Sequence, residues 1–288
     1  MSVSPAETPP LATVPPLRRV LVRAERRWRL PDLAAVWQYR ELFWVLALRD
    51  IRVRYKQTVL GIAWAIVQPL CAMIVFTGIS RFARIPTNGT RPEVFYYCGL
   101  LVWLLFANAM SSAGNSLLGS QHLITKVFFP RVILPVATVV TAVLDFAIAF
   151  VVLLAMMLFY GVTPAPQIAL APVFVALACA TAVGFGLWLS ALVAQFRDVR
   201  HIAPFVTQLW LFCTPILYPS SAVGGGWKKL LLDLNPMSAI VEGFRWCVLG
   251  QSPPALSALL LAGATIAVVL GSSLYYFQRV ERTLADRI

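Results

Sequence analysis

Few side chains in this sequence of 288 residues are placed where they could carry out covalent chemistry. Transfer of a sugar from a lipid carrier needs clustered acidic residues that act as a base or bind a metal ion. Glu93, Asp233 and Glu242 are separated along the chain and form no clustered pair. Acyl transfer needs a histidine close to an acidic residue, and His122 has no acidic neighbour. A membrane enzyme is therefore a less favoured hypothesis, and we assign no catalytic residue.

The sequence also contains no motif for binding a nucleotide or a metal ion. No segment matches the phosphate-binding pattern GxxxxGK[ST], because the glycines at 224–226 precede Lys228 and Lys229 with the wrong spacing. The five cysteines form no CxxC pair and lie in or beside apolar runs, where thiols pack as small apolar groups. We predict no cofactor or metal in this chain, so that a partner would have to bind any ATP and magnesium.

Asp145 is the one acidic residue inside a predicted membrane span. A charged side chain at the centre of a bilayer costs about 3 kcal/mol on insertion scales, so such residues usually face protein or water. Asp145 would be either a proton or substrate site, or a carboxylate satisfied by neighbouring helices or facing a channel. We favour the second interpretation, because no other predicted span contains an ionisable residue that could act with it in a relay.

The composition identifies a membrane protein. Hydrophobic residues make up 59% of the chain, charged residues only 12%, and the mean hydropathy is +0.77. Soluble domains are closer to half apolar and a quarter charged. Lys, Arg, Asp and Glu are absent from residues 57–80, 94–125, 146–196, 201–227 and 246–278. Because about 20 apolar residues form a helix that crosses a hydrocarbon core of about 30 Å, these stretches predict several crossings.

We predict an all-α protein with six transmembrane helices, at residues 59–80, 94–116, 137–160, 168–194, 202–218 and 255–277. Residues 236–250 form an apolar run too short to span, which indicates a re-entrant or half-buried outer helix. Residues 1–30 read as a disordered cytoplasmic tail rich in proline and basic residues. Residues 31–57 read as an amphipathic helix lying in the membrane interface, with Trp37 and Trp44 opposite Glu41 and Arg49.

The basic residues predict the orientation. Eleven of the 24 precede Gln57, beside the first predicted span, and the predicted cytoplasmic segments hold eighteen against six outside. Because basic residues accumulate on the cytoplasmic side, both termini are predicted to be cytoplasmic. The net charge of +12 is explained in the same way, by attraction to anionic lipids rather than to nucleic acid.

The segment from Arg49 to Trp64, RDIRVRYKQTVLGIAW, is the most informative motif and continues to Gln68-Pro69. Two further motifs follow in order: QFRDVRH at 195–201 with TPILY at 214–218, and NPM at 235–237 with Glu242 and Arg245 downstream. Together with KVFFP at 126–130, this pattern resembles the membrane subunits of ABC-2 type permeases that export polysaccharides, O-antigen or teichoic acids. The resemblance covers about residues 30–280 and accounts for the closely spaced Asp198 and His201.

The resemblance implies a homodimer of six-span subunits around a central channel in the inner membrane. Two copies of a separate cytoplasmic ATPase, which binds ATP and magnesium, would drive export of a lipid-linked glycan such as O-antigen, a step in lipopolysaccharide biosynthesis. The cytoplasmic segments 116–129 and 195–201 would contact that ATPase. The residues expected to couple the two subunits are Gln121, His122, Lys126, Arg197, Asp198 and Arg200.

Charge and position suggest further roles. A basic group at the predicted cytoplasmic entrance could meet the pyrophosphate of a lipid carrier: Arg49, Arg52, Arg54, Tyr55 and Lys56. Sugar rings stack on aromatic faces, so the channel candidates are Trp103, Phe106 and Trp210, together with Asp145. Glu242 and Arg245, three residues apart on the outer helix, are expected to pair across one turn as a structural ion pair.

Rival transport functions are an ABC-2 permease for a cargo without glycan, against which the first-span motif argues, and a secondary transporter driven by ions. The second would need Asp145 to carry the coupling alone, and the sequence has none of the pairwise symmetry of many such transporters.

Overall fold

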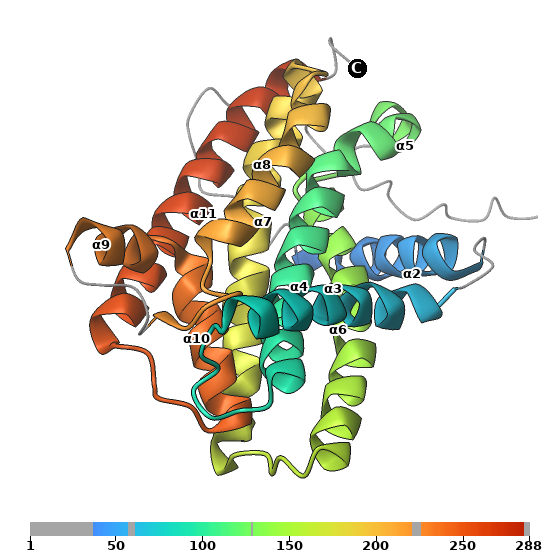
Figure 1. The fold of residues 1–288 in the computed structure, drawn as a ribbon. Helices are drawn as coiled ribbons and strands as arrows, with labels where there is room; N and C mark the ends of the chain where they lie inside the picture. The colour runs from blue at the N-terminus through green and yellow to red at the C-terminus, as the bar shows by residue number, and fades with distance from the viewer. Residues whose placement is uncertain (1–36, 57–60, 128, 221–225, 285–288) are drawn as a thin grey trace, which may run out of the picture.

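A computed structural model describes residues 37–56, 61–127, 129–220 and 226–284, and their regular structure is entirely helical (Figure 1). The predicted tail and the first part of the predicted interfacial helix lie outside these residues. In chain order the helices are α2 (Arg40–Lys56), α3 (Ala63–Ala83), α4 (Pro92–Gly119), α5 (Gln121–Lys126), α6 (Ile133–Phe159), η1 (Pro166–Leu170), α7 (Ala171–Gln195), α8 (Val199–Cys213), α9 (Trp227–Leu234), α10 (Pro236–Leu249) and α11 (Leu256–Leu284).

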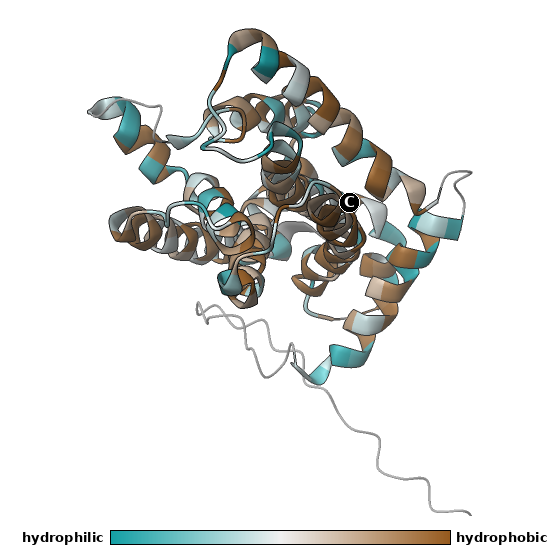
Figure 2. Cartoon of the chain, turned by 60° about the horizontal axis from the view of Figure 1, so that its bottom comes forward, coloured by the Kyte–Doolittle hydropathy of each residue, from teal (hydrophilic) through white to brown (hydrophobic). Residues whose placement is uncertain are grey.

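Five of the described helices are long and apolar enough to cross a membrane: 63–83, 92–119, 133–159, 166–195 and 256–281. They match five of the six predicted spans, with ends that differ by a few residues. α3 crosses α4 and α6 at a steep angle, whereas α4, α6, α7 and α11 run along the bundle (Figure 1). Figure 2 shows hydrophobic residues along the helices and hydrophilic ones mainly at helix ends and connections.

The expected span at 202–218 is interrupted in the structure. α8 has 15 residues and ends at Cys213, where Thr214 adopts an extended conformation. Thr214 precedes Pro215, and a residue before proline is disfavoured in the helical region. A helix of this length rises only about 22 Å, less than the thickness of the hydrocarbon core. The sixth crossing therefore stays a prediction.

α4 forms the centre of the bundle and is buried along most of its length. Small residues let its neighbours approach closely: a Cβ on Gly186 of α7 would overlap Ala113 of α4, and one on Gly184 would press on Val269 of α11. Transmembrane helices associate through such close contacts because lipid offers no hydrophobic driving force between them. α7 is thus held between α4 and α11 by its small face.

The connections gather at the two ends of the bundle. α5, the α7–α8 turn and the end of α11 lie at one end, which we call the α5 end (Figure 1). There the backbone N–H of Arg131 donates to Glu281 and its guanidinium donates to the Glu281 carbonyl oxygen, each at 3.1 Å. At the opposite end Gln251 donates to Thr90 over 3.2 Å. The described segments after α2 that are predicted to be cytoplasmic all lie at the α5 end.

α10 matches the short apolar run predicted at 236–250. Asn235 caps its start by accepting a hydrogen bond from the Met237 N–H over 3.1 Å, Pro236 occupies the first turn, and Gly250 ends it in a left-handed conformation. Most of α10 is buried within the protein. Its helical state and bounds are confirmed, while its re-entrant position in the bilayer stays a prediction. α9, just before it, was not predicted.

Packing around α10 generates the first prediction. A Cβ on Gly243 would overlap the ring of the buried Phe174 on α7, so Gly243→Ala should destabilise the protein by about 1 to 3 kcal/mol. Gly263 on α11 has no atom within 4 Å of its would-be Cβ, and Gly263→Ala should be neutral or slightly stabilising. Thermal unfolding of the purified variants in detergent measures both. Equal midpoints for the two variants would contradict the close contact between α7 and α10.

Candidate functional site

The end of α2 is bound to the middle of α6 through Asp145. The Tyr55 hydroxyl donates a hydrogen bond to one carboxylate oxygen, and an Arg54 guanidinium nitrogen lies 2.6 Å from the other. Burial is the main cause and the hydrogen bond to Asp145 the second cause of a raised pKa of the Tyr55 phenol. The phenol therefore stays protonated and donates its hydrogen bond. Asp145 is only 8% exposed. The structure thus gives this carboxylate partners from a neighbouring helix, as expected for a satisfied group.

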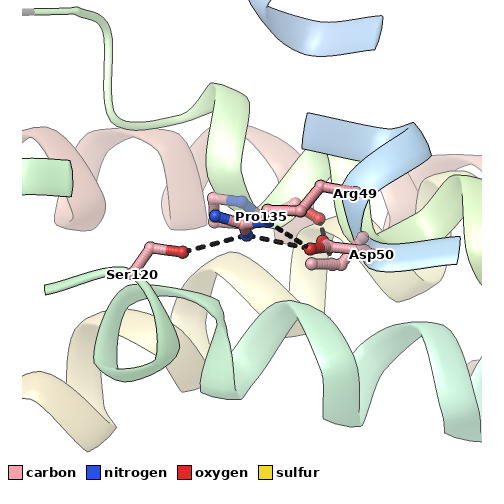
Figure 3. A network of polar contacts seen from close by, with 5 residues as sticks. Arg49, Asp50, Ser120 and Pro135 are labelled. Carbon is pink, nitrogen blue, oxygen red and sulfur yellow. Dashed lines mark hydrogen bonds and ion pairs between the residues drawn. The ribbon is translucent and has the colours of Figure 1, made fainter. Parts of the chain in front are cut away.

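A second contact fixes α2 to the α5 end. Arg49 lies 2.8 Å from Asp50 and donates to the Ser120 hydroxyl, at the junction of α4 and α5, over 3.4 Å (Figure 3). Leu46 and Ala47 form the buried face of α2, while Trp37, Trp44 and Leu48 are exposed. The exposed tryptophans suit the lipid interface predicted for this helix. Of the predicted entrance group, Arg52, Arg54 and Lys56 are exposed and Tyr55 is half-buried.

This cluster lines a small cavity, which borders a larger one. The smaller, of about 50 Å³, is lined by Arg54, Tyr55 and Asp145. The larger, of about 370 Å³, is a groove between α4, α7 and α8. Gln68, Leu104 and Asn108 line both cavities, so the two are neighbours. The groove carries hydroxyl and amide side chains in an otherwise apolar bundle, together with one cation: Gln68, Asn108, Ser111, Asn115, Thr207, Gln208 and Arg200.

The three predicted aromatic channel residues belong to one cluster. The ring centroids of Phe106 and Trp210 lie 5.0 Å apart, those of Trp103 and Phe106 5.3 Å, and Phe185 lies 4.8 Å from Trp210. Trp103 lines the groove, whereas Phe106 is fully buried and lines neither cavity. Trp210 donates from its indole nitrogen to Asn235 over 3.1 Å. The cluster therefore lies behind one wall of the groove, to which Trp103 contributes as a lining residue although it is only 4% exposed.

The predicted ion pair between Glu242 and Arg245 is wrong: no contact within 4 Å joins the two charges among the ion pairs of the described residues. Arg245, only 2% exposed, instead donates to the carbonyl oxygens of Pro215 and Ile216, each at 2.8 Å. Its guanidinium also lies 3.7 Å from the centroid of the Phe95 ring. A side chain at Gly99 would overlap it, so the glycine makes room for the arginine.

Asp233 and Glu242, which the sequence places in one outer connection, both line one cavity at the opposite end of the bundle. Burial raises the pKa of Glu242, and the nearby Asp233 adds to that effect. Glu93 lies elsewhere and pairs with Arg81. Within the described ranges, no group of three or more His, Cys, Asp and Glu side chains could hold a metal ion.

The residues predicted to couple to an ATPase lie together at the α5 end (Figure 1). Gln121, His122 and Lys126 belong to α5, while Arg197, Asp198 and Arg200 belong to the α7–α8 turn or the start of α8. All except the half-buried Gln121 are exposed. Arg200 additionally lines the groove. The structure thus places the two predicted contact segments at the same end of the bundle.

A family model described as ABC-2 type transporter matches residues 41–249, which include the basic cluster, the groove and α10. This match covers most of the chain. The protein belongs to the ABC-2 type transporter family. It is a multi-pass membrane permease, a transport subunit whose ATP hydrolysis takes place in a separate partner chain.

Curated relatives extend over nearly the whole permease. The O-antigen export system permease protein RfbA of Myxococcus xanthus is 29% identical over 258 residues, 88% of this chain and 97% of the relative. RfbA of Klebsiella pneumoniae is 28% identical and covers 71% of this chain and 79% of its own. The polysialic acid transport protein KpsM of Escherichia coli is 26% identical, with 84% and 94% covered.

Sequence reasoning missed two groups of residues in the permease. Asn235 connects α8 to α10: besides capping α10 it accepts from Trp210 and donates to the Thr214 hydroxyl over 3.0 Å. Its signal was the Asn-Pro pair, which predicts a helix start but not the partners. Gln68 and Asn108 were missed because a single amide in an apolar run carries no pattern of its own.

Arg245 generates the second prediction. Arg245→Lys should destabilise the permease by at least about 2 kcal/mol, because an ammonium group cannot donate to two carbonyl oxygens in a fixed fork while stacking on Phe95. Glu242→Gln should leave the stability largely unchanged, since no ion pair is lost. Thermal unfolding in detergent compares the two. Matching losses for both variants would restore the predicted Glu242–Arg245 pair.

Proposed function

We propose that the permease exports a lipid-linked polysaccharide, such as O-antigen, across the inner membrane, with both termini in the cytoplasm. The observation that carries this proposal is the polar groove in the apolar bundle, which borders the small cavity lined by the basic end of α2. A glycan is rich in hydroxyl groups that need hydrogen-bond partners inside a membrane. The relatives named for O-antigen and polysialic acid support this cargo over one without glycan.

The basic end of α2 would receive the charged end of the cargo. Arg52 and Lys56 are exposed there, while Arg54 is held by Asp145. Basic side chains bind phosphate groups through charge-assisted hydrogen bonds, and a lipid carrier presents a pyrophosphate at the membrane surface. In this assignment Arg52 and Lys56 contact the cargo, and Arg54, Tyr55 and Arg49 position α2.

The groove would carry the sugars. Its amide and hydroxyl groups can accept from and donate to sugar hydroxyls, and Trp103 offers an aromatic face. Asn115 supports this use, because its buried amide oxygen has no hydrogen-bond partner within the described residues. Phe106 and Trp210 support the wall rather than touch the glycan. Asp145, whose oxygens are engaged by α2, fits a positioning role better than a proton relay.

A homodimer would complete the channel. The face of α8 away from the bundle exposes five large apolar residues beside the polar groove: Ile202, Phe205, Val206, Leu209 and Phe212. A second copy would cover this face and separate the groove from lipid. α8 and the segment after it, held by Arg245, would together supply the sixth crossing, and α10 would enter the membrane without spanning it.

At the α5 end, two copies of an ATPase would contact α5 and the α7–α8 turn. The exposed charges there, with Arg131 bound to Glu281, offer a polar docking face. ATP and magnesium would be bound by those partners, with no cofactor in the permease itself. Coupling of ATP hydrolysis to transport would require contacts between permease and ATPase that differ between nucleotide states.

The third prediction tests the function directly. A strain lacking this permease should lose surface polysaccharide and accumulate lipid-linked glycan inside, and the tagged full-length chain should restore export. The same chain, purified in gentle detergent, should carry a soluble protein with a phosphate-binding loop in about equal amount, identified by mass spectrometry. A homo-oligomer without any ATPase under every detergent and nucleotide condition would disprove the proposal.

The fourth prediction separates contact with the cargo from positioning. Arg54→Gln should lower both stability, by about 1 to 3 kcal/mol, and export, because it leaves the buried Asp145 without its cation. Arg52→Gln and Lys56→Gln, the same kind of change on the same helix, should lower export while leaving the unfolding temperature unchanged. Staining of surface polysaccharide and thermal unfolding provide the two readouts. Unchanged export in the Arg52→Gln and Lys56→Gln variants would remove the entrance role.

A further inference from the structure

The cavity at the opposite end of the bundle shares no lining residue with the groove. It has a volume of about 320 Å³, within the range of small-molecule binding sites. Segments far apart in the sequence build it: Asn88 from the α3–α4 connection, Lys229 and Asp233 from α9, Glu242 and Arg245 from α10, and Gln251 beyond α10. These polar side chains from four separate segments therefore face one cavity.

The charged side chains on this cavity form no ion pair within 4 Å with one another among the described residues. Lys229 and Asp233 are four residues apart on α9, yet neither forms an ion pair among those found in the described part of the chain. Glu242 accepts from Ser220 rather than from Arg245. Arg245 is buried, and its Nε has no hydrogen-bond partner among the described residues. Hydrogen-bonding capacity is thus left over on the wall of the cavity.

The balance of charge selects the ligand. Two carboxylates face two cations, so neither a phosphate nor a metal cation is favoured over the other. A neutral ligand with many hydroxyl groups fits both, because it donates to carboxylate and amide oxygens and accepts from ammonium and amide N–H groups. Pro253 and Pro254 add apolar surface for the C–H faces of a sugar ring. A carbohydrate segment needs a wall that offers hydrogen-bond donors, hydrogen-bond acceptors and apolar surface, and this cavity has all three.

We infer that this cavity is a second carbohydrate subsite, which binds a short segment of the glycan as it leaves the groove at the end opposite α5. The inference rests on the proposed function and adds to it a binding site on the exit side. Arg245 connects the two sites, because the carbonyl oxygens that it binds follow α8, and α8 lines the groove. Lys229, Asp233 and Glu242 contact the sugar in this assignment.

The test uses thiol labelling in the full-length permease in lipid nanodiscs. The probe is an oligosaccharide released by mild acid from the surface polysaccharide of the source organism. Ser252 lines the cavity and is exposed, while Ser257 is exposed but does not line it. Over the background of the parent protein, the oligosaccharide should slow maleimide labelling of Ser252→Cys, by about tenfold at ten times its Kd, because only the empty cavity reacts. Labelling of Ser257→Cys should not change.

Two neighbouring lysines supply the matched control. Adding Lys229→Gln to the Ser252→Cys variant should abolish the protection, whereas adding Lys228→Gln, whose side chain lies outside the cavity, should preserve it. Absence of protection, or equal effects of the two lysine changes, would overturn the inference. If the wild-type chain restores export in the deletion strain but shows no protection, only the exit subsite fails. If it does not restore export, the proposed function fails as well.

Discussion

The structure depends on one constraint: a polar group buried away from water must find its partners within the protein. Arg245 shows how this permease meets it. A buried guanidinium would be costly alone, and an extended backbone after Cys213 would leave carbonyl groups without partners. Here each compensates for the other, because the guanidinium donates to the carbonyl oxygens of Pro215 and Ile216. The irregular segment can therefore lie inside the protein, and α10 is fixed to the end of α8.

Asp145 meets the same constraint at a different place. Its carboxylate stands in the middle of the apolar α6, and Tyr55 and Arg54 of α2 satisfy it. This contact fixes the end of α2 beside the small cavity, and Arg49 fixes the same helix to Ser120 near α5 (Figure 3). The position of the exposed Arg52 and Lys56 follows from these contacts. A buried acid on α6 thus determines where the exposed basic residues at the end of α2 lie.

Helices could be predicted from local sequence patterns, whereas contacts between residues far apart in the chain could not. Long apolar runs predicted five helices, and the short apolar run at 236–250 predicted α10 almost to the residue, because the apolar pattern of a helix is a local property. The Glu242–Arg245 pair failed because spacing of three says only that two side chains share a helix face. The true partners of Arg245 lie 29 and 30 residues earlier, and Tyr55 lies 90 residues from Asp145, at distances over which one sequence carries no pairing signal. Thr214-Pro215 did contain the signal for the early end of α8, but its apolar neighbours concealed it.

These contacts also explain how distant parts of the permease are connected. α8 begins at the turn that contains Arg197 and Asp198 and ends at the segment held by Arg245 and Asn235. Between these points it lines the groove and, through Trp210, contacts the aromatic wall. α8 joins these points as one helix, in which Pro204 near the start lacks the backbone N–H of a helical hydrogen bond. A force applied at the α5 end would therefore act on the groove and on α10 together, which suits the proposed ATPase contact at that end and the proposed exit subsite at the opposite end.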